Sequence, residues 1–382
     1  MLRKDDIHFV KETIAPYSSP LLSLYVDVNP SNPDNARRAW LVRAKNTIKS
    51  LQIPRDIANK AIETLEFDRP DARTYALFVA QNLVRIYVLQ VDLPVVDLAH
   101  GRVEARWGEP YVFPLEYVLD EYERYGVVFI DKVKWRLYEV FLGEIEECTD
   151  AFLELGSGGQ SRKLEKRPAA RVTPGVELRG GAEGDHYARH IDAVVHRFYK
   201  RAAHLLAKLV ETSHIDRLIF MGPHEDTHLF EQCLPRALRQ RTAGHIPSLP
   251  NPQASAGEVL KRVTPFVAES RQARELALLQ DLRERGMWGP RILEALQMGR
   301  LHLLVAPWSL NARVLRCAGG LVVEDQRAAE AFCPGQIAQE VALRDVLADL
   351  ATAHGARLEF VQGQAEARLL GEFGGLAGLP RW

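Results

Sequence analysis

The sequence predicts a multidomain protein of mixed α/β and α+β class. The chain has 382 residues, which is enough for two or three domains. Segments with helical spacing of apolar residues alternate with short segments that are rich in β-forming residues. A glycine-, arginine- and proline-rich stretch at 156–184 is too polar and too broken for a core element, so it predicts a long loop.

Composition narrows the class of protein. The chain is 47% hydrophobic and 26% charged, as soluble globular proteins are, and its net charge is -1. Because no global positive field attracts nucleic acid, any contact with RNA must come from local basic patches. The N-terminus has no apolar signal region, and no apolar run reaches the roughly 18 residues that a membrane helix needs. These features predict a cytoplasmic protein without a membrane segment.

The first predicted domain covers residues 1–123 and is an α+β module. The expected strands are 21–28, 75–79 and 83–91, and the expected helices are 36–50 and 57–65. The first of these helices is basic; its cationic side chains are Arg37, Arg38, Arg43, Lys45 and Lys49.

The second predicted domain covers residues 124–266. The expected strands are 127–130, 137–142, 152–155 and 218–221, and a helix is expected at 227–240. A long helix follows the glycine-rich stretch, with Asp185 as its N-cap. Apolar residues at spacings of three and four predict one buried stripe: Tyr187, Ile191, Val194, Phe198, Ala202, Leu205 and Leu209. Basic residues lie off this stripe, namely Arg189, Arg197, Lys200, Arg201 and Lys208.

The third predicted domain covers residues 267–382. The expected helices are 273–285, 290–298, 340–354 and 365–372, and the expected strands are 301–306 and 357–361. Helices that alternate with strands indicate an α/β sandwich with helices on the faces of the sheet.

Three blocks of sequence carry a family resemblance: RYGVVFIDK at 124–132, GPRILEALQMGRLHLLVAP at 289–307 and GEFGGLAGLPRW at 371–382. In order and spacing they resemble the archaeal and eukaryotic class-I release factor and Pelota superfamily. The resemblance implies an RNase H-like middle domain and a C-terminal domain of the L7Ae type. The segment NTIKS at 46–50 is similar to the family's stop-codon loop but carries an additional Thr47. The family's cysteine-bearing stop-codon motif has no match near 111–122.

Two segments compete for the position of the family's Gly-Gly-Gln loop. The literal match is Gly158-Gly159-Gln160. The other is Arg179-Gly180-Gly181-Ala182-Glu183-Gly184, from which the chain continues without a gap into a basic helix that resembles the family's own. The register of that helix favours the second segment. Ala182 then replaces the glutamine that helps to place the attacking water, and an alanine side chain cannot orient water by hydrogen bonding.

The resemblance implies that the chain enters the ribosome. Residues expected at the decoding centre are Asn46, Ile48, Lys49 and Ser50. Those expected to contact ribosomal RNA are Arg162, Lys163, Lys166, Arg167, Arg171, Arg189, Arg197 and Lys200. For the loop at 162–171 the competing interpretation is a solvated surface. The expected partners are the 70S ribosome with its 16S and 23S rRNA and a translation GTPase such as elongation factor Tu, with the chain monomeric off the ribosome.

Three other patterns are typical of metal sites, and we expect neither metal nor cofactor from them. His224-Glu225-Asp226-Thr227-His228 fits the HExxH pattern of zinc proteases, but His224 is expected to precede the helix and no third ligand is evident. His186 and His190 are four residues apart, as histidines on a helix surface often are. The four cysteines are Cys148, Cys233, Cys317 and Cys333; they form no CxxC pair, so we expect free thiols and no disulfide framework.

The predicted function is that of an A-site factor that causes ribosome hibernation or protection without catalysis, as in hibernation factors of the Balon kind. One alternative is an enzyme: a codon-independent release or rescue factor that uses Gln160 for peptidyl-tRNA hydrolysis. Another is a Pelota-like factor that dissociates stalled ribosomes together with a GTPase.

Overall fold

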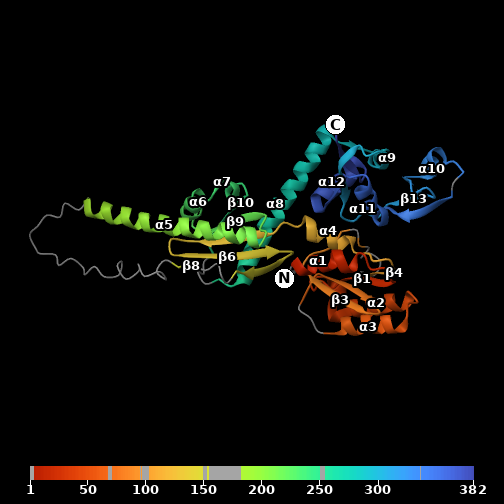
Figure 1. The fold of residues 1–382 in the computed structure, drawn as a ribbon, viewed down its shortest axis with the longest axis horizontal. Helices are drawn as coiled ribbons and strands as arrows, with labels where there is room; N and C mark the ends of the chain where they lie inside the picture. Colours follow the sequence, from red (N-terminus) through yellow and green to blue (C-terminus); the bar gives the residue numbers. More distant parts are fainter. Residues whose placement is uncertain are drawn as a thin grey trace, which may run out of the picture. The chain divides into compact units, whose positions relative to one another are not determined.

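The computed structural model of the protein describes residues 4–67, 71–94, 96, 103–148, 153–154, 182–249, 254–335 and 337–382. The chain divides into two compact units (Figure 1). We call residues 122–266 the middle unit, and residues 2–121 together with 267–382 the two-part unit. The predicted mixed α/β class with several sheets is confirmed. The division into three domains stays a prediction.

The N-terminal half of the two-part unit is built on an antiparallel sheet with strand order β3-β2-β1-β4. Its elements are α1 (Lys4–Phe9), the π-helical turn η1 (Val10–Ile14), β1 (Leu21–Asp27), the 3-10 helix η2 (Pro33–Arg38), α2 (Ala39–Ser50), α3 (Arg55–Glu66), β2 (Thr74–Ala80), β3 (Leu83–Leu89), β4 (Val103–Gly108) and α4 (Phe113–Glu121). The apolar runs of β1 and β2 are buried along their whole length, which agrees with the three strands predicted in this region. Alternate residues of these strands pack against α2 and α3 in one core.

The predicted helix at 36–50 begins later than expected. Ala36 has extended backbone angles, and Arg37 and Arg38 have φ of 54° and 58°, in the left-handed region. Residues other than glycine rarely adopt this region, and it cannot continue an α-helix. The α-helix therefore begins at Ala39, after the separate turn η2.

The C-terminal half of the two-part unit holds two sheets, with strand orders β11-β17-β12-β16 and β14-β13-β15. Its elements are α8 (Ala256–Arg285, of which residues 256–266 belong to the middle unit), β11 (Met287–Trp288), α9 (Ile292–Gln297), β12 (Leu301–Pro307), β13 (Arg313–Cys317), β14 (Val322–Val323), α10 (Gln326–Phe332), β15 (Ala338–Ala342), α11 (Leu343–Ala353), β16 (Arg357–Val361), α12 (Gly363–Phe373) and β17 (Ala377–Pro380). The strands predicted at 301–306 and 357–361 pair in parallel as β12 and β16. The helix predicted at 340–354 begins at Leu343, because the residues before it form β15.

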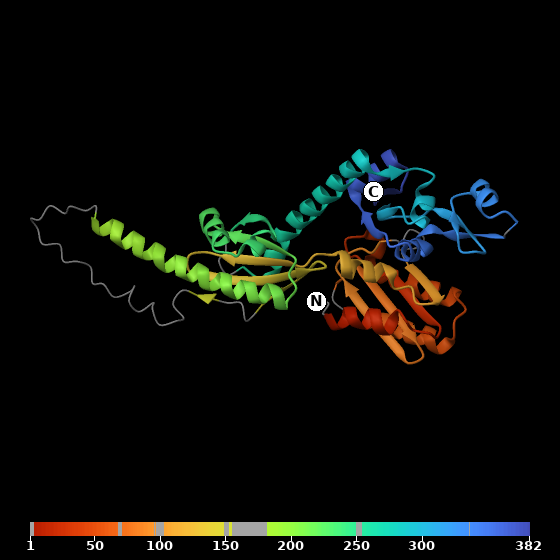
Figure 2. The same cartoon turned by 45° about the horizontal axis from the view of Figure 1, so that its top comes forward.

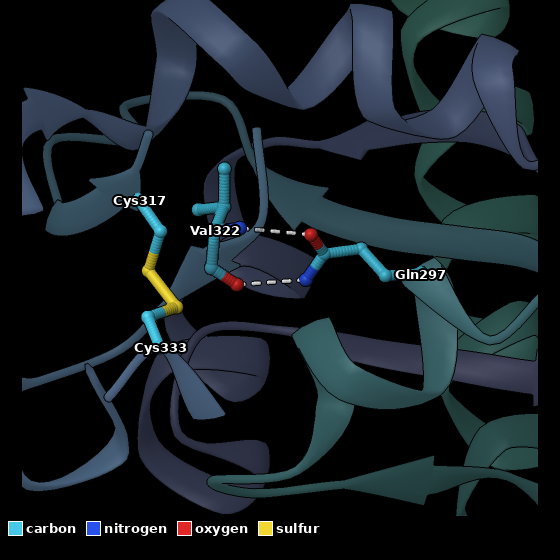
Figure 3. Close-up of a disulfide and its surroundings, with 4 residues drawn as sticks. All are labelled: Gln297, Cys317, Val322 and Cys333. Atoms are coloured by element: carbon cyan, nitrogen blue, oxygen red, sulfur yellow. Dashed lines mark hydrogen bonds between the residues drawn. A yellow bond between two sulfur atoms is a disulfide. The ribbon is translucent and has the colours of Figure 1, made fainter. Parts of the chain in front are cut away.

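Cys317 and Cys333 form a disulfide, so the expectation of free thiols at these positions was wrong (Figure 3). Their Cα atoms lie 6.3 Å apart, joining the end of β13 to the residue after α10. Beside them Gln297 of α9 makes two hydrogen bonds to the backbone of Val322: its Nε2 donates to the carbonyl at 2.7 Å, and its Oε1 accepts from the N–H at 2.8 Å. The prediction held for Cys148 and Cys233, which are free.

Within the two-part unit, charged and aromatic side chains far apart in sequence meet. Glu104 of β4, 7% exposed, is bound by Arg106 at 2.5 Å and by Arg344 of α11 at 3.3 Å. Arg106 also binds Asp345 at 2.7 Å. These ion pairs connect β4 of the N-terminal half to α11 of the C-terminal half.

The middle unit is a mixed sheet with strand order β10-β9-β5-β6-β7, and β8 pairs with β6. Its elements are β5 (Tyr125–Ile130), β6 (Lys134–Phe141), β7 (Glu144–Glu147), β8 (Leu153–Glu154), α5 (Ala182–Thr212), β9 (Arg217–Gly222), α6 (His224–Gln232), α7 (Arg236–Arg239) and β10 (Thr242–Pro247). Strands β10, β9 and β5 are parallel to one another, and β5, β6 and β7 are antiparallel. The helix predicted at 227–240 is two helices, because Pro235 stands at the N-cap of α7 and ends the first run.

Helix α5 lies along this sheet and projects beyond it at its N-terminal end (Figures 1 and 2). It begins at Ala182, so Asp185 lies inside the helix and is not its N-cap. The predicted stripe was right for Phe198 and Ala202. Because the helix covers a broad sheet, its buried face is wider than one stripe; the fully buried set is Phe198, Tyr199, Ala202, Ala203, Leu206 and Val210. Leu205 and Leu209 are only partly buried.

Candidate nucleic-acid interface

The exposed side of α5 carries a row of cationic side chains. We call it the α5 basic face, and its members are Arg197, Lys200, Arg201 and Lys208. Lys200, Arg201 and Lys208 follow Arg197 by three, four and eleven residues, so all four share one side of the helix. The opposite side, with Phe198 and Leu206, is buried against the sheet and fixes how the helix is rotated.

No acidic residue interrupts this face between 193 and 210. All four cationic side chains are exposed. Arg197 uses its Nε to donate to the carbonyl of Ala193 at 3.3 Å. Such a row can neutralise phosphates one by one and release their counterions, which makes binding dependent on salt.

Most of the predicted ribosomal contacts fall outside the described residues. This holds for Gln160, Arg162, Lys163, Lys166, Arg167, Arg171, Arg179, Gly180 and Gly181. Ala182, Glu183 and Gly184 are placed in the first turn of α5 and are not in a loop. Arg189 lies in the same helix, and of the predicted cationic contacts only Arg197 and Lys200 have described side chains.

The segment expected at the decoding centre forms the last turns of α2. Asn46, Lys49 and Ser50 are exposed, whereas Ile48 is 1% exposed and packs in the core between helix and sheet. The contact expected of Ile48 stays a prediction, and its side chain lies on the buried face of the helix.

The basic side chains next to this segment are partly engaged within their own unit. Arg38 Nη2 donates to the carbonyls of Leu65 and Glu66, each at 3.3 Å. Arg43 donates to the carbonyl of Asp34 at 2.8 Å, and Lys45 pairs with Glu66. These contacts connect the basic side chains to the end of α3 and to the turn η2. Fewer cationic side chains in and beside α2 are therefore available to bind RNA than the sequence indicates.

The HEDTH segment begins α6, directly after β9. His224 is the first residue of the helix, so the expectation that it precedes the helix was wrong. His224 and His228 therefore share one face, with ring centroids 4.2 Å apart. Sequence reasoning missed two neighbours of His228, Glu231 and His245, because His245 comes from the separate strand β10. The side chains of His186 and His190 lie outside the described part of the structure.

On the buried side of α6, Asp226 is 4% exposed and its Oδ1 has no hydrogen-bond partner. The hydroxyl of Tyr199 on α5 is also buried, and burial first and the nearby Asp226 charge second raise the pKa of Tyr199. These two groups face the interior between α5 and α6. They therefore play no part in the α5 basic face.

Comparison with known families identifies the central part of the chain. Residues 110–265 match the family described as bacterial archaeo-eukaryotic release factor family 10. The central segment of the chain is thus similar to this bacterial family of release factor-like proteins. The matched segment contains the whole of α5 and its basic face.

One similar relative is peptide chain release factor subunit 1 of Methanocaldococcus jannaschii. The two sequences are 21% identical over 413 aligned residues, which cover 95% of this chain and 92% of the relative. The chain thus matches this relative over nearly its full length.

Similar solved structures include the archaeal translation termination factor aRF1, with 16% identity, a TM-score of 0.26 and coverage of 100% of this chain and 99% of that one. Pelota of Archaeoglobus fulgidus is 14% identical, with a TM-score of 0.33 and coverage of 81% and 79%. At TM-scores this low, these similarities do not define the arrangement of the present chain.

Among the described residues, no helix is both long and apolar enough to cross a membrane.

Proposed function

We propose that this chain binds the ribosome in the A site and blocks it without hydrolysing peptidyl-tRNA, which gives hibernation or protection. The observation that carries the proposal is the α5 basic face: four exposed cations on one side of a helix whose other side is fixed by the core. The helix lies in the segment that matches the release factor family, and a row of cations of this kind suits an RNA backbone.

The absence of catalysis rests on Ala182, which stands where the favoured register expects the catalytic glutamine. The chain would act in the cytoplasm on the 70S ribosome, with 16S rRNA near α2 and 23S rRNA near α5. A translation GTPase such as elongation factor Tu would deliver it.

Co-sedimentation with vacant 70S ribosomes, and with ribosomes that carry P-site peptidyl-tRNA, tests binding and peptide release together. We expect binding to vacant ribosomes and no release. The double variant Arg197→Gln/Arg201→Gln should bind more weakly, with the slope of log affinity against log salt reduced by about two. Arg236→Gln/Arg239→Gln, which removes two exposed arginines of α7 in the same unit, is the matched control and should bind normally.

A hydrolytic rescue factor is the second candidate, because the sequence also contains the literal Gly158-Gly159-Gln160. Codon-independent peptide release that disappears in Gln160→Ala would establish it and reject the favoured register. Failure to bind ribosomes at any salt concentration would reject both candidates.

A further inference from the structure

Three side chains of the middle unit converge outside the α5 basic face: His228 and Glu231 of α6 and His245 of β10. One ligand atom from each lies within 4.8 Å of the other two. Glu231 Oε2 is 3.0 Å from His245 Nε2 and 4.0 Å from His228 Nδ1. Within the described residues this is the one group of its kind.

The backbone explains why these residues meet. His228 and Glu231 are three residues apart on α6 and so project from one face of the helix. His245 belongs to β10, which runs parallel to β9, and α6 starts where β9 ends. The group therefore lies on the crossover between two parallel strands, in the kind of α/β unit whose ligands bind beyond the carboxyl ends of the strands.

We propose that His228, Glu231 and His245 form a binding site for Zn²⁺. Two imidazole nitrogens and one carboxylate oxygen are a ligand set that zinc accepts, with bonds of about 2.0–2.2 Å. Tetrahedral ligands at that bond length are about 3.4 Å apart, and the two measured separations lie on either side of this value. Small side-chain movements are therefore sufficient to close the site around the ion.

The surroundings favour a metal ion over a simple hydrogen-bonded pair. The rings of His228 and His245 are stacked, with centroids 4.1 Å apart and planes at 18°, and both turn toward the same carboxylate. The side chains of Glu231 and His245 are only 22% and 21% exposed, so two of the ligands are held in place by packing. His228 is 42% exposed, which gives the ion an entry path from solvent.

Three protein ligands leave a fourth position for water. The bound ion would join α6 to the edge strand β10 and stabilise the crossover between β9 and β10. Mg²⁺ should not compete, because it prefers oxygen ligands and octahedral geometry. This site is independent of ribosome binding and does not require the HExxH arrangement, since Glu225 takes no part in it.

The test uses the full-length chain without a histidine tag, treated with chelator and then titrated calorimetrically with Zn²⁺ or Mg²⁺. We expect one Zn²⁺ per chain, no Mg²⁺, and a higher melting temperature with zinc. Zinc affinity should fall in each of three variants: His228→Ala, Glu231→Gln and His245→Ala. Loss of a residue that only supports a ligand lowers metal affinity by roughly 10–100-fold, and loss of a ligand itself should lower it by more. His204→Ala, an exposed histidine on α5, is the matched control and should bind like the parent.

Two outcomes would overturn the site. One is a parent chain that binds no zinc; the other is zinc binding unchanged in both His228→Ala and His245→Ala. Loss of binding in His224→Ala and His228→Ala, but not in His245→Ala, would instead assign the metal to the two histidines of the HExxH segment and also reject the proposal. Circular dichroism without zinc confirms that each variant folds, and the half-exposed His228 is the variant least prone to misfolding.

Discussion

Gly222 lies at a very close approach between two strands of the middle unit. A Cβ atom at this position would lie 2.1 Å from the carbonyl oxygen of Ile130 and 3.2 Å from Thr227 Cγ2. The first neighbour is backbone of β5, which pairs with β9, so it cannot move without disturbing the sheet. We expect Gly222→Ala to lower the free energy of unfolding by about 1–3 kcal/mol or more, as overpacking does.

Urea denaturation measures this effect. Gly257→Ala is the control, because a Cβ at Gly257 meets nothing within 4 Å and the residue lies in α8. That substitution should be neutral or slightly stabilising. Equal urea midpoints for Gly222→Ala and the parent would show that the strand ends are not this close.

Glu324, beside α10, gives the two-part unit a dependence on pH. Burial first, and the negative charge of Asp325 second, raise the pKa of Glu324 to about 7. The folded state thus favours the protonated carboxyl. The resulting stability is fully present below the ordinary pKa near 4.5 and is lost as the pH rises through about 7.

Melting temperatures at pH 5 and pH 8 test this sign. The parent should lose stability between the two values more than Glu324→Gln does. Glu340→Gln, which removes an exposed carboxylate from β15, should behave like the parent. A Glu324→Gln variant with the same pH dependence as the parent would contradict the prediction.

At the level of residues, sequence patterns identified the cations of α5 but not the metal-site group. Arg197 and Lys200 were predicted because helical spacing places them opposite apolar residues, and both are exposed. His245 could not be linked to His228, since only the parallel pairing of β10 with β9 brings the two together. Ile48 shows the converse: similarity to a loop motif assigned a contact to a residue that its own helix buries.

Among the elements, the small sheet β14-β13-β15 is cross-linked to the end of α10 by the disulfide between Cys317 and Cys333. Its core is small, consisting of the two cysteines with Val323 and Ala329 and a few partly buried neighbours. A cross-link over 16 residues stabilises by about 3 kcal/mol by restricting the unfolded chain. We expect Cys317→Ser/Cys333→Ser to reduce the stability of this region by up to about that amount.

Thiol titration in denaturant gives the direct measurement. Oxidised protein should expose two thiols, and reduced protein four. Cys148→Ser/Cys233→Ser is the control, which should leave no reactive thiol until a reductant is added. Four reactive thiols in the oxidised parent would show that the bond does not form. In a reducing cytoplasm the same bond would be open.

Long or strongly apolar elements were predictable, and short ones were not. Strands β1, β2 and β12 are short apolar runs, and such runs predict buried strands. The strand β14 has two residues and owes its existence to pairing with β13. Helix α8 begins 17 residues before its predicted start at 273, although Pro265 inside it disfavours a helix by propensity.

For the whole molecule, the joining of the N- and C-terminal parts into one unit is the feature least visible in the sequence. Arg344 and Glu104 are 240 residues apart, and no periodicity connects them. Tyr117 of α4 likewise accepts a hydrogen bond at 2.8 Å from the backbone N–H of Phe360, and their rings meet edge to face with centroids 4.8 Å apart. Only the tertiary structure reveals that residues 2–121 and 267–382 share polar and aromatic contacts.

Glu104 is the centre of this junction, because it is buried and binds Arg106 and Arg344 together. Replacing it with alanine leaves two partly buried guanidinium groups without their shared carboxylate. Breaking a buried ion pair from one side costs about 3–5 kcal/mol, whereas an exposed pair contributes about 0–1 kcal/mol.

Arg285→Ala, which removes an exposed i,i+4 partner of Asp281, is therefore the control and should have little effect. Chemical denaturation of the full chain should show a large loss of stability for Glu104→Ala alone. If both variants unfold at the parent's midpoint, the ion pairs do not hold the two halves of the unit together.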